Sequence, residues 1–337
     1  MKNLKKIIGN FSRARILVVG DLILDQYIHG AVDRVSPEAP VPVVWANKRF
    51  YVPGGAANVA NNIRALDAEV SLVGVLGRDA HARILLSELK KRRVDTRGIF
   101  TEAKRQTILK TRVIAGHQQV VRVDWEDCRP LSEAASRKVA GFIRRNIERF
   151  DAIIIEDYGK GVINQRLLEE LVRLARSHRK IITVDPKEEH FQYYRRVTSI
   201  TPNRKELENA VRNLKIKDTA NKFRVYSDRL FTDRDIEDAA RQVREYLDLD
   251  SVLVTLGEQG MKLFEKSGRM TYIPTVAQEV FDVSGAGDTV IATFTLGLAA
   301  GANLREAASI ANFAAGIVVG KAGTAVATRK ELLERTR

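Results

Sequence analysis

The chain has 337 residues, 45% of them hydrophobic and 29% charged, a composition that is typical of a folded soluble protein and excludes a disordered class. The 56 lysines and arginines exceed the 42 aspartates and glutamates, and the net charge of +14 favours nucleic acid, anionic lipid or phosphorylated metabolites, or is simply a basic surface. The single cysteine, Cys128, excludes an intrachain disulfide and a cysteine-rich metal site. No apolar segment resembles a signal peptide or is long enough to cross a bilayer, so we expect a cytoplasmic protein without a membrane partner.

Short β-branched runs alternate with helical patterns along most of the chain. Strands are predicted at residues 16–19, 70–76, 152–155, 181–184 and 252–255, and helices at about 56–66, 80–92, 132–147, 165–177 and 236–247. This alternation predicts an α/β fold with a doubly wound, mostly parallel sheet and helices on both faces. Ligands of such a sheet bind at the carboxyl ends of its strands.

The first predicted strand ends in VVGDLILD, which places Asp21 and Asp25 near its carboxyl end. A polyhydroxylated ligand at that edge would need such acceptors, although either aspartate also fits an ordinary turn. The next motif, PGGAANVANN, contains Gly54 and Gly55 before a helix that carries Asn58. Adjacent glycines permit close backbone approach, and amides bind hydroxyls without charge, but a glycine-rich loop is also typical of a structural turn.

Two segments, residues 27–52 and 105–123, interrupt the alternation and are predicted to be extended. In the second, TILKTRVIAGHQQVVRVD alternates between apolar and polar residues, and Gly116 marks a hairpin turn. Strands without intervening helices predict a small β-layer, whose apolar face must be covered by a substrate or by a second subunit. Further along, the charged stretch at residues 212–235 is interpreted as a surface insertion.

The strongest chemical signal is DVSGAGDTVIATF at residues 282–294, where a Gly-Ala-Gly turn leads directly into a helix. The backbone N–H groups of such a turn and the positive end of the helix together form an anion site. Asp288 lies at the mouth of this site, where a carboxylate could accept the proton of an attacking hydroxyl. The alternative is that Asp288 is only a helix N-cap.

These two glycine-rich signatures, in this order and at this separation, resemble those of the ribokinase, or phosphofructokinase-B, family of carbohydrate kinases. The resemblance extends over about residues 15–330, and it is supported by TPNRKE at 201–206, by VTLGEQG at 254–260 and by Asn312 in a late helix. It implies a single kinase domain over residues 1–337, with a ribokinase-like fold, a β-lid and the cofactors ATP and Mg²⁺. In this family the lid closes over the sugar and often joins two subunits, which implies a homodimer.

The resemblance also implies roles for individual residues. Asp288 would be the catalytic base, and the backbone of Gly285, Ala286 and Gly287 would form the anion hole for the transferred phosphoryl group. The implied sugar-binding positions are Asp25, Gly55 and Asn58, with Asp21 and Gly54 beside them. The implied nucleotide-binding positions are Asn203, Glu206, Thr255, Gly257, Gly260 and Asn312, and Glu206 would also hold the metal through water. Asp67 stands where the family usually has glycine, a departure that concerns a turn.

A narrower resemblance is carried by DRVSPEAPVPVV, QQVVRVDWE, EDYGKG and VDPK, which begin at residues 33, 118, 156 and 184. These motifs resemble the branch of the family that phosphorylates the anomeric hydroxyl of D-glycero-D-manno-heptose 7-phosphate in lipopolysaccharide heptose synthesis. Candidate cations for the sugar phosphate are Lys110, Arg112, Arg122, Lys160 and Lys187. The alternatives are a kinase for fructose, ribose or fructose 6-phosphate, or a non-catalytic basic binding protein on the same fold. The chain contains no recognised nucleic-acid-binding module, so we expect no nucleic-acid partner.

Overall fold

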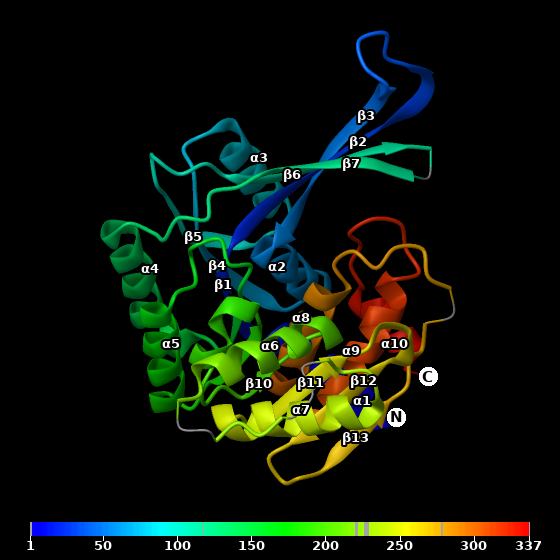
Figure 1. The fold of residues 1–337 in the computed structure, drawn as a ribbon. Helices are drawn as coiled ribbons and strands as arrows, with labels where there is room; N and C mark the ends of the chain where they lie inside the picture. Colours follow the sequence, from blue (N-terminus) through cyan, green and yellow to red (C-terminus); the bar gives the residue numbers. More distant parts are fainter. Residues whose placement is uncertain (1, 117, 220–221, 226–228, 278, 337) are drawn as a thin grey trace.

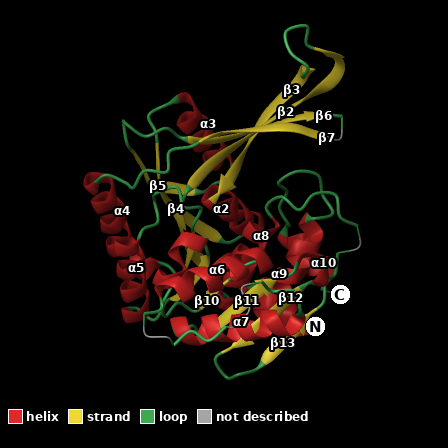
Figure 2. Cartoon of the chain, in the orientation of Figure 1, coloured by secondary structure: helices red, strands yellow, loops and turns green. Residues whose placement is uncertain are grey.

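The computed structural model describes residues 2–116, 118–219, 222–225, 229–277 and 279–336. Within these residues the strands form a nine-stranded sheet and a separate four-stranded sheet that projects away from it (Figure 1). Helices cover both faces of the large sheet (Figure 2). The predicted α/β class and the predicted projecting β-layer are therefore confirmed.

The large sheet has the strand order β13-β12-β11-β10-β9-β8-β1-β4-β5. Its strands are β1 (Arg15–Gly20), β4 (Glu69–Leu76), β5 (Asp95–Thr101), β8 (Ala152–Glu156), β9 (Ile181–Asp185), β10 (Ser199–Ile200), β11 (Ser251–Thr255), β12 (Met261–Glu265) and β13 (Met270–Ile273). All neighbours from β5 to β11 pair in parallel, whereas β12 and β13 are antiparallel. The sheet is thus mostly parallel, as the sequence predicted.

The core is divided by the large sheet into two layers. On β1, Ile16 and Val18 pack into one buried cluster, while Leu17 and Val19 pack into the other. This explains why the strand is a continuous apolar run, because both of its faces are buried. One face is covered by α4 (Glu133–Asn146), α5 (Gln165–Ser177), α6 (Arg204–Lys217) and α7 (Asp233–Leu247). The other face is covered by α1 (Lys2–Gly9), α2 (Ala56–Ala65), α3 (Ala80–Lys91), α8 (Ala286–Ala299), α9 (Leu304–Val318) and α10 (Arg329–Arg335).

The four-stranded sheet, which we call the lid, has the order β3-β2-β6-β7. It consists of β2 (Leu22–Val35), β3 (Pro42–Gly55), β6 (Ile108–Ala115) and β7 (Gln118–Trp125). The first strand pair extends past the predicted segment 27–52 at both ends, because β2 begins soon after β1 and β3 continues to α2. The buried start of β2 anchors the lid in the core, and its exposed end lies at the tip (Figure 1).

The charged stretch at residues 212–235 is only partly the surface insertion that the sequence predicted. Its first residues continue α6 to Lys217 and its last residues begin α7, because apolar side chains such as Leu214 face the core. Between the two helices Phe223 is also buried in the core, while residues 220–221 and 226–228 lie outside the described part. None of the described helices combines the length and apolar character that crossing a membrane requires.

Candidate active site

The candidate active site lies at the carboxyl ends of β1, β8 and β9, where the N-terminus of α8 meets the base of the lid. Gly285 precedes α8 with a φ of 77°, in the left-handed region that favours glycine. A Cβ atom at this position would lie 2.8 Å from the amide nitrogen of Asn58. The Gly-Ala-Gly turn therefore brings the start of α8 close to α2.

The predicted anion hole coincides with the first turn of α8, whose backbone N–H groups lack partners within the helix. The N–H group of Ala286 is already engaged in the turn, because it donates to the carbonyl oxygen of Val283 at 3.2 Å. Gly287 faces the carboxylate of Asp185, since a Cβ on Gly287 would lie 4.0 Å from Oδ2 of that residue. The positive end of α8 is thus directed at a group of acidic side chains.

Asp288 is 6% exposed and lies in the first turn of α8. Its Oδ2 accepts a hydrogen bond from Nδ2 of Asn58 at 2.6 Å, and its Oδ1 accepts one from the hydroxyl of Tyr158 at 3.2 Å. Burial raises the pKa of Asp288 to about 6, while the two hydrogen bonds lower it. The carboxylate is therefore ionised at neutral pH, yet basic enough to accept a proton.

Asn58 is fully buried on α2 and directs its side chain at Asp288. A second link runs parallel to it, because the hydroxyl of Thr289 on α8 donates to Oδ1 of Asn62 on α2 at 2.8 Å. The asparagines of the PGGAANVANN motif thus fix the two helices against each other. A sugar contact for Asn58 stays a prediction.

Asp21 has a structural task that the sequence did not predict. Its fully buried carboxylate accepts backbone hydrogen bonds from Tyr158 and Lys160, both at 3.0 Å, and from Val162 at 3.1 Å. These bonds hold the loop after β8, which carries the tyrosine that contacts Asp288. Both oxygens accept these bonds away from solvent, so Asp21 fixes this loop, and its contact with a sugar stays a prediction.

Asp25 lies at the base of the lid and is also buried. Its Oδ1 accepts a hydrogen bond from Nη1 of Arg112 at 2.5 Å, and a Cβ at Gly54 would clash with its Oδ2. Burial raises the pKa of Asp25, and the charge of Arg112 opposes this effect. Gly55 follows with a φ of 55°, so the glycine pair permits the close approach of β3 to this carboxylate.

The predicted phosphate-binding cations lie mostly at the lid base and are paired with carboxylates. Lys110 contacts Asp124 at 3.1 Å and Glu126 at 2.9 Å, and Lys160 contacts the same Glu126 at 2.5 Å. Arg122 contacts Asp124 at 2.9 Å, and Arg112 is paired with Asp25 as described above. Lys187 differs, because no ion pair within the described residues includes it. Burial raises the pKa of the neighbouring Glu206, and the charge of Lys187 opposes this effect.

The predicted nucleotide-binding residues lie beyond β9, along the edge formed by β10 and β11. Asn203 and Glu206 form a capping box at the start of α6, in which each side chain accepts a hydrogen bond from the backbone N–H of the other. Thr255 ends β11 and forms a bridge to Asn203. The Asn-x-x-Glu motif therefore caps the start of a helix, and its contact with a nucleotide stays a prediction.

The glycines of VTLGEQG shape the turn that follows β11. Gly257 and Gly260 have φ values of 59° and 84°, and a Cβ at Gly260 would clash with the carbonyl oxygen of Ile273. Asn312 is 5% exposed and donates to the carbonyl oxygen of Pro274 at 2.7 Å, which holds the chain after β13 against α9. The structure thus places these residues together at one edge of the large sheet, and their contact with a nucleotide stays a prediction.

Sequence reasoning missed two acidic residues at the centre of the site. Glu156 ends β8 and Asp185 ends β9, and the two residues are direct partners in the parallel ladder. Their carboxylates and that of Asp288 have oxygen atoms within 4.8 Å of one another. Burial and the neighbouring negative charges raise the pKa values of Glu156 and Asp185 well above the usual range. The available signal was that each acid follows a buried strand, in the EDYGKG and VDPK motifs.

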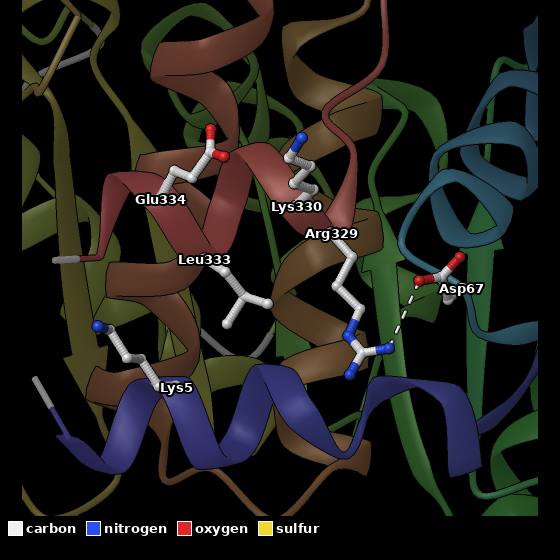
Figure 3. A pocket seen from close by; sticks show the side chains of 6 residues that line it. All are labelled: Lys5, Asp67, Arg329, Lys330, Leu333 and Glu334. Carbon is white, nitrogen blue, oxygen red and sulfur yellow. Dashed lines mark hydrogen bonds and ion pairs between the residues drawn. The ribbon is translucent and has the colours of Figure 1, made fainter.

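A surface pocket of about 440 Å³ lies away from these residues, between α1, α10 and the turn after α2 (Figure 3). Asp67, in this turn, has a φ of 67°, in the left-handed region that favours glycine. Its carboxylate lies 3.5 Å from Nη1 of Arg329 on α10. None of the predicted site residues lines this pocket.

A lid above a buried carboxylate at a helix N-terminus, on a mostly parallel sheet, defines a sugar kinase of the ribokinase type. The family model described as pfkB family carbohydrate kinase matches residues 13–331, and the chain belongs to this family. The family predicted from the sequence is thereby confirmed.

Known proteins similar to this chain include bacterial relatives named "Bifunctional protein HldE". That of Helicobacter pylori strain HPAG1 is 44% identical over 318 residues, and that of Geobacter metallireducens is 41% identical over 332 residues. These matches cover 94% and 98% of the chain, but the chain spans only 65% of the length of each relative.

Solved structures show the same fold at low sequence identity. Arabidopsis thaliana ribokinase, complexed with ribose and ATP, has a TM-score of 0.72 and 18% identity over 96% of this chain and 99% of its own. Escherichia coli phosphofructokinase-2, in complex with potassium, has a TM-score of 0.74 and 20% identity over 96% and 100%. The ribokinase-like fold is thus confirmed.

Proposed function

We propose that this chain transfers the γ-phosphoryl group of ATP to the anomeric hydroxyl of D-glycero-D-manno-heptose 7-phosphate, which gives the 1,7-bisphosphate and ADP. The observation that carries the proposal is the position of Asp288, a buried base at the N-terminus of α8 beneath the lid. The relatives named HldE support the heptose phosphate over fructose, ribose or fructose 6-phosphate as the acceptor. The same proposal places the chain in the cytoplasm, where ATP is available.

In the proposed reaction, Asp288 accepts the proton of the anomeric hydroxyl as its oxygen bonds to the γ-phosphorus and the bond to the bridging oxygen of ADP breaks. Asn58 and Tyr158 hold the carboxylate in place through their hydrogen bonds. The N–H groups at the start of α8, notably that of Gly287, stabilise the charge on the transferred group. Bound Mg²⁺ would neutralise phosphate charge, with Glu206 holding it through water.

The lid base supplies the positive charge that a phosphorylated sugar requires. Three cations, Lys110, Arg122 and Lys160, share the two carboxylates of Asp124 and Glu126, so part of their charge is available to a sugar phosphate. Arg112, on the face of the lid that carries Asp25, also packs over the ring of Tyr27 at 5.4 Å. Lys187 is the remaining candidate, and its side chain lies next to Gly159 in the loop after β8.

The test is a comparison of kcat/KM for the heptose 7-phosphate with that for unphosphorylated heptose, fructose and ribose. Without the phosphate, the partly buried cations lose one of their partners. Rejection of such an analogue can reach about 10⁴-fold in a site that excludes water. Fructose 6-phosphate is the control for a shorter phosphorylated sugar. Equal or better turnover of any neutral sugar would overturn the heptose phosphate assignment while leaving the kinase mechanism intact.

We further propose that the chain is a homodimer joined through the lid. Val121 and Val123 point to the face of β7 opposite Arg122, and both are exposed. Val121 pairs with Val113, which pairs with Ile28, so this outer face presents a continuous apolar row. An apolar face on an otherwise charged sheet is typical of a surface that a partner covers.

A further inference from the structure

Five arginines surround a surface pocket on the side of the large sheet remote from the candidate active site. The pocket has a volume of about 240 Å³ and lies at the amino ends of β1, β4 and β5. Arg15 begins β1, and Asp21 follows the other end of the same strand, so a rise of about 3.3 Å per residue separates the two places by roughly 20 Å. We call this the arginine pocket, and its arginines are Arg15, Arg64, Arg93, Arg97 and Arg149.

The positive charge of the arginine pocket is only partly compensated. Its two carboxylates are those of Glu69 and Asp95, so the five arginines exceed them by three charges. Asp95 pairs with Arg97 at 2.7 Å, and Arg15 has a more distant partner in Asp151 at 3.9 Å. Among the described residues, Glu69 forms no ion pair. Guanidinium groups cannot lose a proton to relieve their mutual repulsion, so the folded chain gains free energy if an anion enters the pocket.

The other three arginines have no carboxylate partner within the described part of the chain. There, neither a hydrogen bond nor an ion pair engages the guanidinium of Arg93. Arg149 donates to Oδ1 of Asn146 at 3.1 Å. Arg64 is held in place by a hydrogen bond from Nη1 to the carbonyl oxygen of Ala68 at 2.6 Å, while its Nε has no partner among the described residues. Much of the hydrogen-bonding capacity of these three side chains is therefore unused.

The geometry of the pocket indicates the class of anion. Its lining residues come from the starts of β1, β4 and β5 and from the turn before β8, and these four strands are neighbours in the sheet. Neighbouring strands lie about 4.8 Å apart, so the positive charges are spread over roughly 14 Å, more than one phosphate group covers. The volume is below the range of about 300–1,000 Å³ that is typical of drug-sized ligands. Among the described lining residues the one aromatic ring, that of Phe150, is buried and offers no surface on which a nucleic-acid base could stack.

We propose that the arginine pocket binds a small anion with two or more phosphate groups, at a site separate from the phosphoryl transfer at α8. A guanidinium presents paired N–H donors that match the oxygens of a phosphate group. Arg93 and Arg149 supply contacts from side chains that are little engaged otherwise, and Arg64 supplies one that its own hydrogen bond already holds in position. The site does not depend on the proposed kinase function, so either proposal can fail without the other.

The test is a calorimetric titration of the full chain with tripolyphosphate, with fructose 1,6-bisphosphate and with inorganic phosphate. The first two carry phosphate groups at short and at long separation, and we expect at least one of them to bind more tightly than inorganic phosphate. A hydrogen bond to a charged group contributes about tenfold or more to affinity, so Arg93→Met and Arg149→Met should each weaken this binding at least about tenfold. Arg234→Met is the matched control, because it removes the same charge from an exposed position on α7 outside the pocket.

A second control separates the pocket from the active site. Lys187→Met should leave the binding unchanged, and Arg93→Met and Arg149→Met should retain the sugar-kinase turnover of the unaltered chain. Binding that Lys187→Met abolishes and Arg93→Met leaves unchanged would assign the anion to the active site and overturn the proposal. Equal loss in Arg234→Met would indicate attraction to the net charge alone, and inorganic phosphate that binds as tightly as the other two anions would refute a site for several phosphates. A single-stranded oligonucleotide that binds more tightly than either anion would indicate a nucleic-acid surface instead. If Arg93→Met does not fold, Arg149→Met decides.

Discussion

The amide nitrogen of Asn58 lies 2.6 Å from Oδ2 of Asp288, so the first glycine-rich motif of the chain donates a hydrogen bond directly to the proposed base in the second. Asn58 belongs to the helix that begins at the base of the lid, and Asp288 belongs to the helix that begins at the anion site. The protonation state of the proposed base therefore depends on where the lid places α2.

Replacing Asp288 with asparagine should nearly abolish phosphoryl transfer while ATP still binds. The amide has a similar size but cannot accept a proton, and general-base catalysis commonly contributes about 10²- to 10⁴-fold. Steady-state turnover and calorimetric ATP binding would be measured on the same preparation. Turnover within a few-fold of the unaltered chain would remove Asp288 from the mechanism.

The pH dependence of kcat/KM should fall on the acidic side near pH 6, because the pKa of Asp288 is raised to about 6 and the protonated form cannot act as a base. Asn58→Ala removes a hydrogen-bond donor that favours the ionised form of Asp288. The pKa of Asp288 should therefore rise, and the acidic limb should move by about one pH unit towards neutral. Tyr158→Phe removes the longer hydrogen bond and should shift the limb less, in the same direction. An unchanged limb in Asn58→Ala would show that this hydrogen bond does not tune the base.

Replacing Val121 with glutamate should convert the proposed dimer into a monomer, because a charge would be buried in an apolar interface. Multi-angle light scattering at micromolar concentration would measure the mass. Ile216→Glu is the matched control, since Ile216 is an exposed aliphatic residue near the end of α6, outside the lid. The proposal is wrong if the unaltered chain is already monomeric, or if both variants dissociate equally.

Replacing Gly161 with alanine should destabilise the fold more than replacing Gly301, although the two glycines have nearly equal φ values of 93° and 94°. Both substitutions incur the cost of a left-handed conformation, roughly 1–2 kcal/mol. Only at Gly161 would the new Cβ clash with the carbonyl oxygen of Arg129, whereas nothing lies within 4 Å at Gly301. Overpacking adds about 1–3 kcal/mol. Denaturant unfolding of both variants measures the difference, and equal stabilities would contradict the clash.

The alternation of strands and helices could be predicted because each predicted strand is a short apolar run buried on both faces. The antiparallel pair β12 and β13 was not predicted, since Met261–Glu265 mixes apolar with charged residues and Met270–Ile273 has only four residues. The extent of α6 was misjudged for a related reason. Its many charges hide the apolar positions, such as Leu207 and Leu214, that face the core.

The position of Asp288 could be predicted because glycines and a helix start mark it locally in the sequence. The acidic group around it could not, because the sequence does not show that β8 and β9 end side by side and so bring Glu156 next to Asp185. The ion pairs of the lid cations could not be predicted for the same reason. Lys110 is paired with Asp124 only because β6 and β7 form a hairpin in that register.

Strand β2 runs without interruption from the buried Leu22 to the exposed Val35, so one continuous strand connects the tip of the lid to the core of the fold. Its pairing with β3 is regular beside Asp25 and shifts only further out, between His29 and Gly30 and again between Val32 and Arg34. Bulges are where a paired ribbon bends and twists most readily. We therefore expect forces applied at the tip, by a second subunit or by an arriving sugar, to bend the outer half of the lid more than the part beside Asp25.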